Sequence, residues 1–161
     1  MKKIALISII CIIIDQIIKL IVVNNMDLAQ SINIINNFFS ITYVRNYGAA
    51  FSILTGNRIF LILVTILAII FIYFIFIKNQ KNSALEMTFY GILFGGIFGN
   101  LIDRIINSYV IDYLDFKILG FNAPIFNFAD MCIVISIFLI VIITFRGSLN
   151  GNNRRCDRKK N

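Results

Sequence analysis

Residues 59–77 read IFLILVTILAIIFIYFIFI and contain no charged side chain. A helix that crosses the hydrocarbon core of a bilayer needs about 20 mostly apolar residues in a row. Three more windows of this kind follow the same pattern, with few polar interruptions, over residues 4–23, 85–106 and 128–145. The sequence therefore predicts a mostly α-helical membrane protein with four transmembrane helices, in a single domain that covers residues 1–161.

The composition excludes several classes of protein. The chain is 59% hydrophobic and carries a net charge of +7, but its positive residues lie between and beyond the apolar windows. We therefore expect anionic phospholipid headgroups as partners and no nucleic acid. Histidine is absent, which excludes a Ser-His-Asp triad and an HExxH zinc centre. The three cysteines show no CxxC spacing, and we expect neither a metal nor an organic cofactor.

The basic residues predict the orientation, since short cytoplasmic loops are enriched in Lys and Arg. Ten of them lie at the N-terminus, in the loop between the second and third windows, and in the tail. The two other loops, 24–58 and 107–127, hold three: Arg45, Arg58 and Lys117. Both termini are expected in the cytoplasm. The first window lacks a small-residue cleavage site, so we expect it to be retained, and the polar tail 147–161 is expected to be disordered.

The two outward loops have features of their own. Residues 39–43 alternate apolar and hydroxyl side chains, and residues 110–116 form a second strand candidate. We expect a small β-sheet on the outer membrane surface. Residues 46–52 (NYGAAFS) follow the first strand, and their small side chains permit close backbone approach. In the third helix, Gly91, Gly95 and Gly99 recur every four residues and predict a smooth groove for another helix.

Polar residues inside the apolar windows indicate a site. Asp15 and Lys19 are spaced to form an ion pair on one helix face, and we interpret them as a supporting pair in which Lys19 reaches outward to the headgroups. Asn100, Asp103 and Arg104 share a face of the third helix. We expect Asp103 to be an ionised partner of Arg104 with an orienting role, and Arg104 to hold a substrate carbonyl or phosphate.

Asp112 and Asp130 are the candidate catalytic pair. Asp112 follows the third helix and Asp130 opens the fourth, so both should lie at the outer edge of the bilayer. Two neighbouring carboxylates cannot both ionise cheaply, and they would share one proton. The ionised group would activate a water as general base, while the protonated group would polarise a scissile carbonyl. From spacing alone, two unrelated surface carboxylates are an equally good interpretation.

Five segments of the chain resemble, in order, the conserved blocks of the lipoprotein signal peptidases (type II signal peptidases). They are residues 15–19 (DQIIK), 45–52 (RNYGAAFS), 99–104 (GNLIDR), 110–113 (VIDY) and 126–130 (FNFAD). The resemblance covers roughly residues 10–145, and each block alone is a weak signal. One departure is Tyr113, where the family usually has Phe, and we expect little consequence from it.

The resemblance implies an aspartyl endopeptidase of the bacterial inner membrane, with both termini cytoplasmic and without a cofactor. Such an enzyme cleaves diacylglyceryl-modified prolipoproteins just before the lipidated cysteine and is inhibited by the cyclic peptide globomycin. The matching positions imply Asp112 and Asp130 as the catalytic dyad and a supporting role for Asp15, Lys19 and Asp103. They also imply substrate-binding positions at Asn46, Gly48, Asn100, Arg104 and Asn127. We expect a monomer.

Other interpretations remain possible at this point. A proton-linked transporter could use Asp15, Lys19, Asp103 and Arg104, although four helices without an internal repeat make this less natural. A non-catalytic membrane scaffold is a third possibility. A Ser-Lys dyad is disfavoured because Ser8, the serine closest to Lys19 in the first window, lies on its inner half. Ile10, before Cys11, is too large for a lipidation site on the chain itself.

Overall fold

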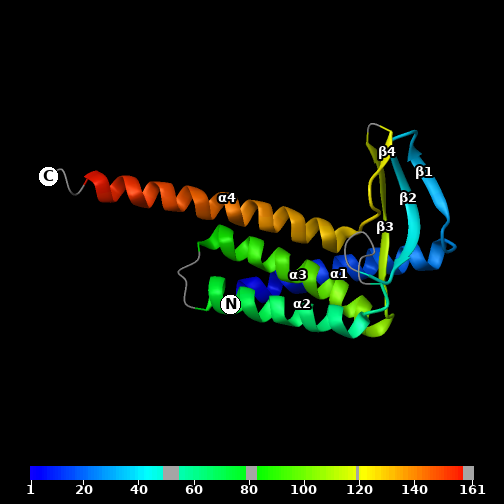
Figure 1. Ribbon diagram of the computed structural model, residues 1–161, viewed down its shortest axis with the longest axis horizontal. Helices are drawn as coiled ribbons and strands as arrows, with labels where there is room; N and C mark the ends of the chain where they lie inside the picture. Colours follow the sequence, from blue (N-terminus) through cyan, green and yellow to red (C-terminus); the bar gives the residue numbers. More distant parts are fainter. Residues whose placement is uncertain (49–54, 79–82, 119, 158–161) are drawn as a thin grey trace.

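The computed structural model describes residues 1–48, 55–78, 83–118 and 120–157, with the side chains of 146–157 excepted. Its helices are α1 (Lys2–Asn25), α2 (Arg58–Ile72), which continues as the short π-helix η2 (Tyr73–Ile77), α3 (Ala84–Ile106) and α4 (Phe128–Asp157). Its strands are β1 (Ser31–Ile35), β2 (Phe39–Asn46), β3 (Val110–Ile118) and β4 (Phe121–Asn122). Figure 1 shows the helices side by side, with the sheet standing across the end of the bundle away from the N-terminus.

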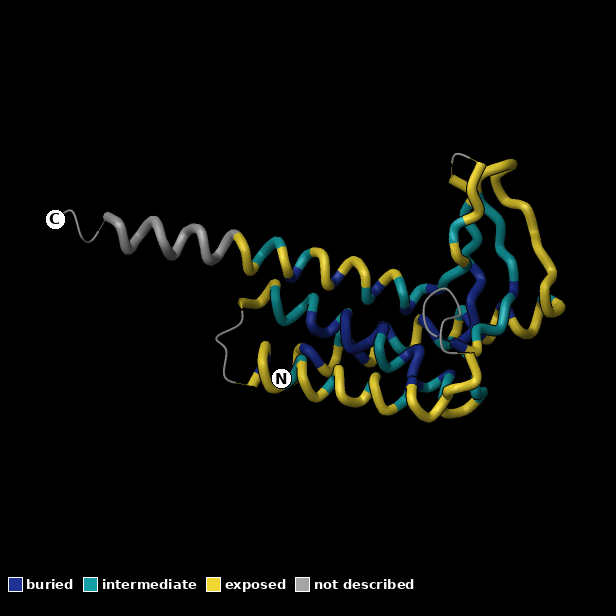
Figure 2. Tube along the Cα trace, viewed as in Figure 1, coloured by how far each residue is buried: buried dark blue, intermediate teal, exposed yellow. Residues whose placement is uncertain are grey.

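Four helices are long and apolar enough to cross a membrane, which confirms the predicted spans: Lys2–Asn25, Arg58–Ile77, Ala84–Ile106 and Phe128–Phe145. α3 is the central helix, since 56% of its apolar window is buried inside the protein, against 6% for α2. Figure 2 shows the exposed residues running along the outer helices. Many of them are large and apolar, such as Ile59, Leu67 and Phe71. In a bilayer these side chains contact lipid, so their exposure is not a cost.

Glycines allow the neighbouring helices to approach α3. A Cβ added to Gly91 would lie 2.8 Å from the Cβ of Ile7, and one added to Gly95 would overlap the Cβ of Cys11. A Cβ at Gly96 would instead collide with the carbonyl oxygen of Ala129. The predicted groove is therefore confirmed on the α1 side of α3, and Gly96 provides a second close approach on the α4 side.

The sheet is antiparallel with the order β1-β2-β3-β4. The register pairs Val44 with Asp112 and Asn46 with Val110, and the pairing shifts between Ile41 and Val44. β2 and β3 confirm the two predicted strand candidates, and β1 and β4 extend the sheet on either side. The pairing of β2 with β3 brings the middle of the loop 24–58 beside the first half of the loop 107–127.

The tail departs from its prediction. Residues 147–161 were expected to be disordered, but α4 continues as a helix to Asp157. Figure 1 shows this part projecting beyond the ends of the other helices. Elongation of an existing helix adds one hydrogen bond per residue without a new nucleation step, and no proline interrupts the tail. Residues 158–161 lie outside the described part of the chain.

Candidate active site

Asp112 and Asp130 meet where β3 reaches the beginning of α4. Asp112 is the third residue of β3 and is 3% exposed, while Asp130 lies in the first turn of α4 and is partly exposed. Asn127, just before α4, connects them. Its Nδ2 donates to Oδ1 of Asp112 at 2.7 Å, and its backbone N–H donates to Oδ2 of Asp130 at 3.2 Å. One fully buried residue thus binds both carboxylates, through its side chain and its backbone.

The beginning of α4 explains the placement of Asp130. Asn127 Oδ1 accepts a hydrogen bond from the backbone N–H of Asp130 at 3.0 Å. The carboxylate of Asp130 in turn accepts the backbone N–H of Asn127. This reciprocal pattern is a capping box, built from Asn and Asp at the spacing of three residues. It stabilises the helix N-terminus, where free N–H groups and the helix dipole favour a negative charge. These donors favour a negative charge on Asp130, against the cost of burying its carboxylate.

Two further amides complete the hydrogen bonding of the pair. Asn46 Nδ2 donates to Oδ2 of Asp112 at 3.0 Å, and Asn100 Nδ2 donates to Oδ1 of Asp130 at 2.7 Å. The side chain of Asn46 also accepts the N–H of Gly48 at 2.9 Å, which fixes the chain after β2. Each of the four carboxylate oxygens thus accepts at least one hydrogen bond from an amide.

Burial dominates the protonation of Asp112. It raises the pKa of this carboxyl from its ordinary value to about 6, and the hydrogen bond from Asn46 opposes this effect. The negative charge of Asp130 contributes to the same rise in the pKa of Asp112. Two like charges in a desolvated site favour a shared proton, and here the more buried strand position favours holding it.

A cavity of about 310 Å³ opens beside the pair. Its lining combines both aspartates with polar side chains of β2 and α3 and with apolar residues of β3, α4 and the segment before α4: Asn46, Asn100, Arg104, Val110, Asp112, Pro124, Ile125, Phe126, Asp130, Ile133 and Val134. A second cavity of about 500 Å³ adjoins it through shared residues such as Pro124 and Asp130, and is otherwise lined by apolar side chains, including Met131 and Ile135. The site therefore opens onto both a polar and an apolar space.

Arg104 lies at the polar side of this cavity. Its Nη2 donates to the carbonyl oxygen of Gly48 at 3.2 Å, and its charge acts on Asp130 and Asp112. The expectation that Asp103 pairs with Arg104 is wrong, because Asp103 instead forms an ion pair with Lys19 at 2.8 Å. Consecutive residues of a helix point about 100° apart, so Asp103 and Arg104 face different neighbours.

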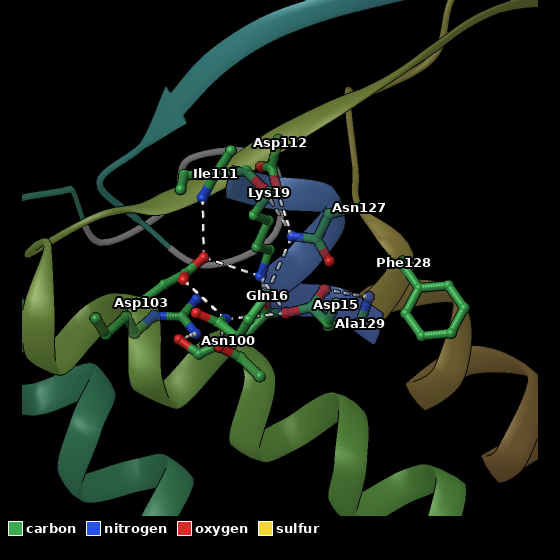
Figure 3. A network of polar contacts seen from close by, with 12 residues as sticks. Asp15, Gln16, Lys19, Asn100, Asp103, Ile111, Asp112, Asn127, Phe128 and Ala129 are labelled. Atoms are coloured by element: carbon green, nitrogen blue, oxygen red, sulfur yellow. Dashed lines mark hydrogen bonds and ion pairs between the residues drawn. The ribbon is translucent and has the colours of Figure 1, made fainter. Parts of the chain in front are cut away.

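Figure 3 shows a polar network beside Asp112, and its central residue is buried. Lys19 Nζ forms ion pairs with Asp15 and Asp103, each at 2.8 Å, and Lys19 is only 1% exposed. The expected outward reach of Lys19 to the headgroups is therefore wrong. Two nearby carboxylates hold its ammonium group inside the protein, where leaving either of them unpaired would be costly.

Two residues of this region belong to the site although the sequence did not predict a role for them. Gln16 Nε2 lies within hydrogen-bonding distance of both Asp15 and Asp103, and its polar side chain inside an apolar window was the available signal. The hydroxyl of Tyr113 accepts the backbone N–H of Phe128 at 3.1 Å, so the tyrosine connects β3 to the start of α4. Burial raises the pKa of Tyr113, which keeps this hydroxyl neutral.

Most of the predicted site positions lie around one cavity, and part of one predicted segment lies outside the described residues. Asn46, Asn100, Arg104, Asp112 and Asp130 line one cavity, and Asn127 lies directly behind it. Of residues 46–52, positions 49–52 lie outside the described residues. Among those described, no group of three or more His, Cys, Asp or Glu side chains could hold a metal ion.

The fold and the site together define a class of protein: a polytopic membrane protein with two adjoining carboxylates in a cavity at one end of its helix bundle, an arrangement typical of an aspartyl peptidase. The model of a family described as "Signal peptidase (SPase) II" matches residues 7–146. The chain belongs to this family and is a membrane peptidase.

Known relatives agree over nearly the whole chain. A lipoprotein signal peptidase of Staphylococcus aureus is 36% identical over 149 residues, which cover 92% of this chain and 91% of the relative. One of Halothermothrix orenii is 40% identical over 147 residues, covering 91% and 98%. A solved structure described as a bacterial membrane enzyme has a TM-score of 0.84 and 35% identity, covering 93% of this chain and 92% of that one. A second has a TM-score of 0.79, also with 35% identity.

Proposed function

We propose that this protein removes signal peptides from diacylglyceryl-modified prolipoproteins, and that Asp112 and Asp130 are its catalytic pair. The observation that carries the assignment of the pair is the bridge by Asn127, whose side chain and backbone bind one carboxylate each. Both carboxylates line one cavity, where a water and a peptide carbonyl can reach them together. The substrate class follows from the family to which the chain belongs.

The surroundings of the two carboxylates support different roles. Asp130, at the helix N-terminus and within the field of Arg104, is the ionised general base. Asp112, whose pKa is raised to about 6 by burial, holds the proton. Asp130 takes a proton from the attacking water while the water oxygen bonds to the scissile carbonyl carbon. Asp112 gives its proton to the carbonyl oxygen, which forms a neutral tetrahedral diol.

Collapse of this intermediate completes the reaction. The carbon–nitrogen bond breaks, the leaving amine takes the proton that Asp130 accepted, and a hydroxyl proton of the diol returns to Asp112. The products are a carboxylic acid on the signal peptide and a free amine on the lipidated cysteine. Both aspartates end in their starting states, so no cofactor is consumed.

The cavities suit a substrate that is polar at the cleavage point and apolar beyond it. Asn46, Gly48, Asn100, Arg104 and Asn127 form the polar side, by lining the cavity or by holding residues that line it. The adjoining apolar cavity beside Met131 and Val134 is suited to the acyl chains of the diacylglyceryl group. The cyclic peptide globomycin would compete for the same space.

The same proposal includes a location. We place the protein in the bacterial inner membrane as a monomer, with both termini in the cytoplasm and the sheet outside. The unequal numbers of Lys and Arg in the loops support this orientation. The alternative of a proton-linked transporter gains no support, because all three protons of the Lys19 ammonium have acceptors within the protein.

Purified full-length protein in detergent with a diacylglyceryl-modified prolipoprotein tests the proposal. Wild type should release the signal peptide, and globomycin should block the release. Asp112→Asn and Asp130→Asn should each lower kcat by about 10²–10⁴-fold, because an amide can neither accept nor deliver the proton.

Asp115→Asn is the matched control. Asp115 lies on the same strand as Asp112 and accepts a hydrogen bond from Thr42 at 2.8 Å, away from the cavity. This variant should retain wild-type kcat. If Asp112→Asn and Asp130→Asn cleave as fast as Asp115→Asn, the catalytic assignment is wrong. Absence of cleavage by wild type would refute the activity itself.

A further inference from the structure

Figure 3 shows the buried side chain of Lys19 among Asp15, Asp103 and Asn100, close to Asp112. Lys19 Nζ contacts Oδ2 of Asp15 at 2.8 Å, Oδ2 of Asp103 at 2.8 Å and Oδ1 of Asn100 at 2.9 Å. A lysine ammonium has three protons, so these three contacts use its full donor capacity. Burying a charge is costly unless it is paired, and here the pairing joins three side chains from two helices.

The first carboxylate partner holds the chain next to Asp130. Asp15 accepts the backbone N–H of Ala129 through Oδ1 at 3.1 Å, while its Oδ2 contacts Lys19. Ala129 immediately precedes Asp130 and is fully buried. The free N–H groups at the start of a helix need acceptors, and Asp15 supplies one from α1. The position of Asp15 therefore sets the position of the first turn of α4.

The second carboxylate partner does the same for Asp112. Asp103 accepts the backbone N–H of Ile111 through Oδ2 at 3.2 Å, and the same oxygen contacts Lys19. Ile111 immediately precedes Asp112 on β3. Each supporting carboxylate thus binds the residue directly before one catalytic aspartate, and Lys19 joins the two supporting carboxylates.

The third contact of Lys19 fixes an amide. Asn100 Oδ1 accepts from Lys19 and also from Asn127 Nδ2 at 3.1 Å. With its oxygen held by two donors, the amide of Asn100 presents its Nδ2 to Asp130 at 2.7 Å. The reversed amide would place an NH₂ group against the ammonium, so Lys19 determines which way Asn100 faces.

We propose that Lys19 is a positioning residue of the peptidase, which sets the distance and orientation between Asp112 and Asp130 by clamping Asp15, Asp103 and Asn100 together. This inference rests on the proposed catalytic role of the two aspartates. It assigns to Lys19 an effect on the chemical step rather than on substrate binding, since Lys19 lies behind the pair and does not line the cavity.

The charge of Lys19 has a separate effect. Its positive charge lowers the pKa of Asp112, against the dominant effect of burial. The effect of Lys19 on position can be separated from the effect of its charge by a variant that leaves the net charge of the cluster unchanged. Lys19, Asp15 and Asp103 together carry a net charge of −1. The double variant Lys19→Met/Asp15→Asn keeps that net charge and keeps an oxygen for the N–H of Ala129. It removes the contacts of Lys19 with Asp15, Asp103 and Asn100.

The test measures kcat, KM and their pH dependence on the folded fraction of each full-length variant with the lipidated substrate. Lys19→Gln should lower kcat on the order of 100-fold with little change in KM, as expected for a displacement of about 1 Å in the reacting groups. The pH at which Lys19→Gln loses activity on the alkaline side should be higher than in wild type, because removal of the positive charge raises the pKa of Asp112. Lys19→Met/Asp15→Asn should lower kcat similarly without that pH shift. Lys19→Arg should restore part of kcat.

Ser8→Ala is the control for a purely structural effect. Ser8 is buried on the same helix and donates to the carbonyl oxygen of Gly91 at 2.8 Å, so it also joins α1 to α3 but lies outside the network of Lys19. This variant should keep wild-type kcat per folded molecule. Wild-type kcat in the double variant, while Asp112→Asn is inactive, would overturn the role of Lys19 and leave the proposed function standing. If Asp112→Asn is active as well, the proposed function itself fails.

Discussion

At the scale of single residues, Asp112 shows a conflict between function and stability. The carboxyl is 3% exposed, and the nearby negative charge of Asp130 adds to the cost of ionising it. Burial without a cationic partner in direct contact favours the neutral form. A carboxyl that holds a proton in the proposed mechanism therefore makes the folded state sensitive to pH.

This conflict predicts a pH-dependent stability. The folded state holds the Asp112 proton up to about pH 6, whereas the unfolded chain releases it near 3.8. The contribution of this proton to the free energy of unfolding amounts to about 3 kcal/mol. It is fully present below about pH 4 and is lost as the pH rises through 6. Asp112→Asn lacks this titration. Thermal unfolding in detergent should show that, from pH 4 to pH 7, the stability of the variant rises relative to wild type by about this amount. A constant difference in stability across this range would contradict the prediction.

The two catalytic candidates could be predicted from the sequence, but their connection could not. Aspartates at the two ends of an outer loop are visible in the sequence, and the family's blocks single them out. The capping box that joins Asn127 to Asp130 depends on the residue at which α4 begins, which periodicity does not determine to one position. The pairing of Asp103 with Lys19 rather than Arg104 depends on how α1 rotates against α3, and that is a tertiary property.

At the scale of elements, the fit of α1 against α3 decides where the polar network forms. A Cβ at Gly99 would lie 2.6 Å from Oδ2 of Asp15, so one of the close approaches of the two helices lies beside the ion pairs. The four-residue spacing of the glycines predicted this contact. The sheet was predicted only in its central strands, because β1 has all five residues exposed and β4 has only two residues, so neither shows a clear alternating pattern.

A side chain at Gly95 should separate these helices. The Cβ of Gly95→Ala would overlap the Cβ of Cys11 and lie 3.1 Å from the carbonyl oxygen of Ser8. Overpacking of this kind costs about 1–3 kcal/mol, and the movement of α1 should also lower kcat. Thermal unfolding and cleavage rates measure the two effects. Ala68→Leu, on the exposed face of α2, adds volume without a neighbour and should change neither; equal effects of the two substitutions would refute the prediction.

At the scale of the whole molecule, the arrangement of the helices separates two ends of different chemistry. The sheet, the aspartate pair and both cavities beside it lie at one end of the bundle, and the N-terminus lies at the other (Figure 1). A prolipoprotein has its lipidated cysteine at the end of an apolar segment, so a peptidase needs its polar machinery at one membrane edge. The four spans could be predicted from hydrophobic length alone, since the bilayer fixes that length.

The orientation of this arrangement can be measured with thiol labelling. Cys11 and Cys132 are buried within spans, and the third cysteine of the sequence, Cys156 in the tail, is the target chosen for a membrane-impermeant maleimide. With the C-terminus in the cytoplasm, intact spheroplasts should leave Cys156 unlabelled until they are permeabilised. The variant Cys156→Ser/Phe121→Cys carries a thiol in β4, where Phe121 is 80% exposed, and it should react in intact spheroplasts. The reverse pattern would place the aspartates on the cytoplasmic side, where the lipidated cysteine of an exported precursor is out of reach, and would refute the proposed function together with the orientation.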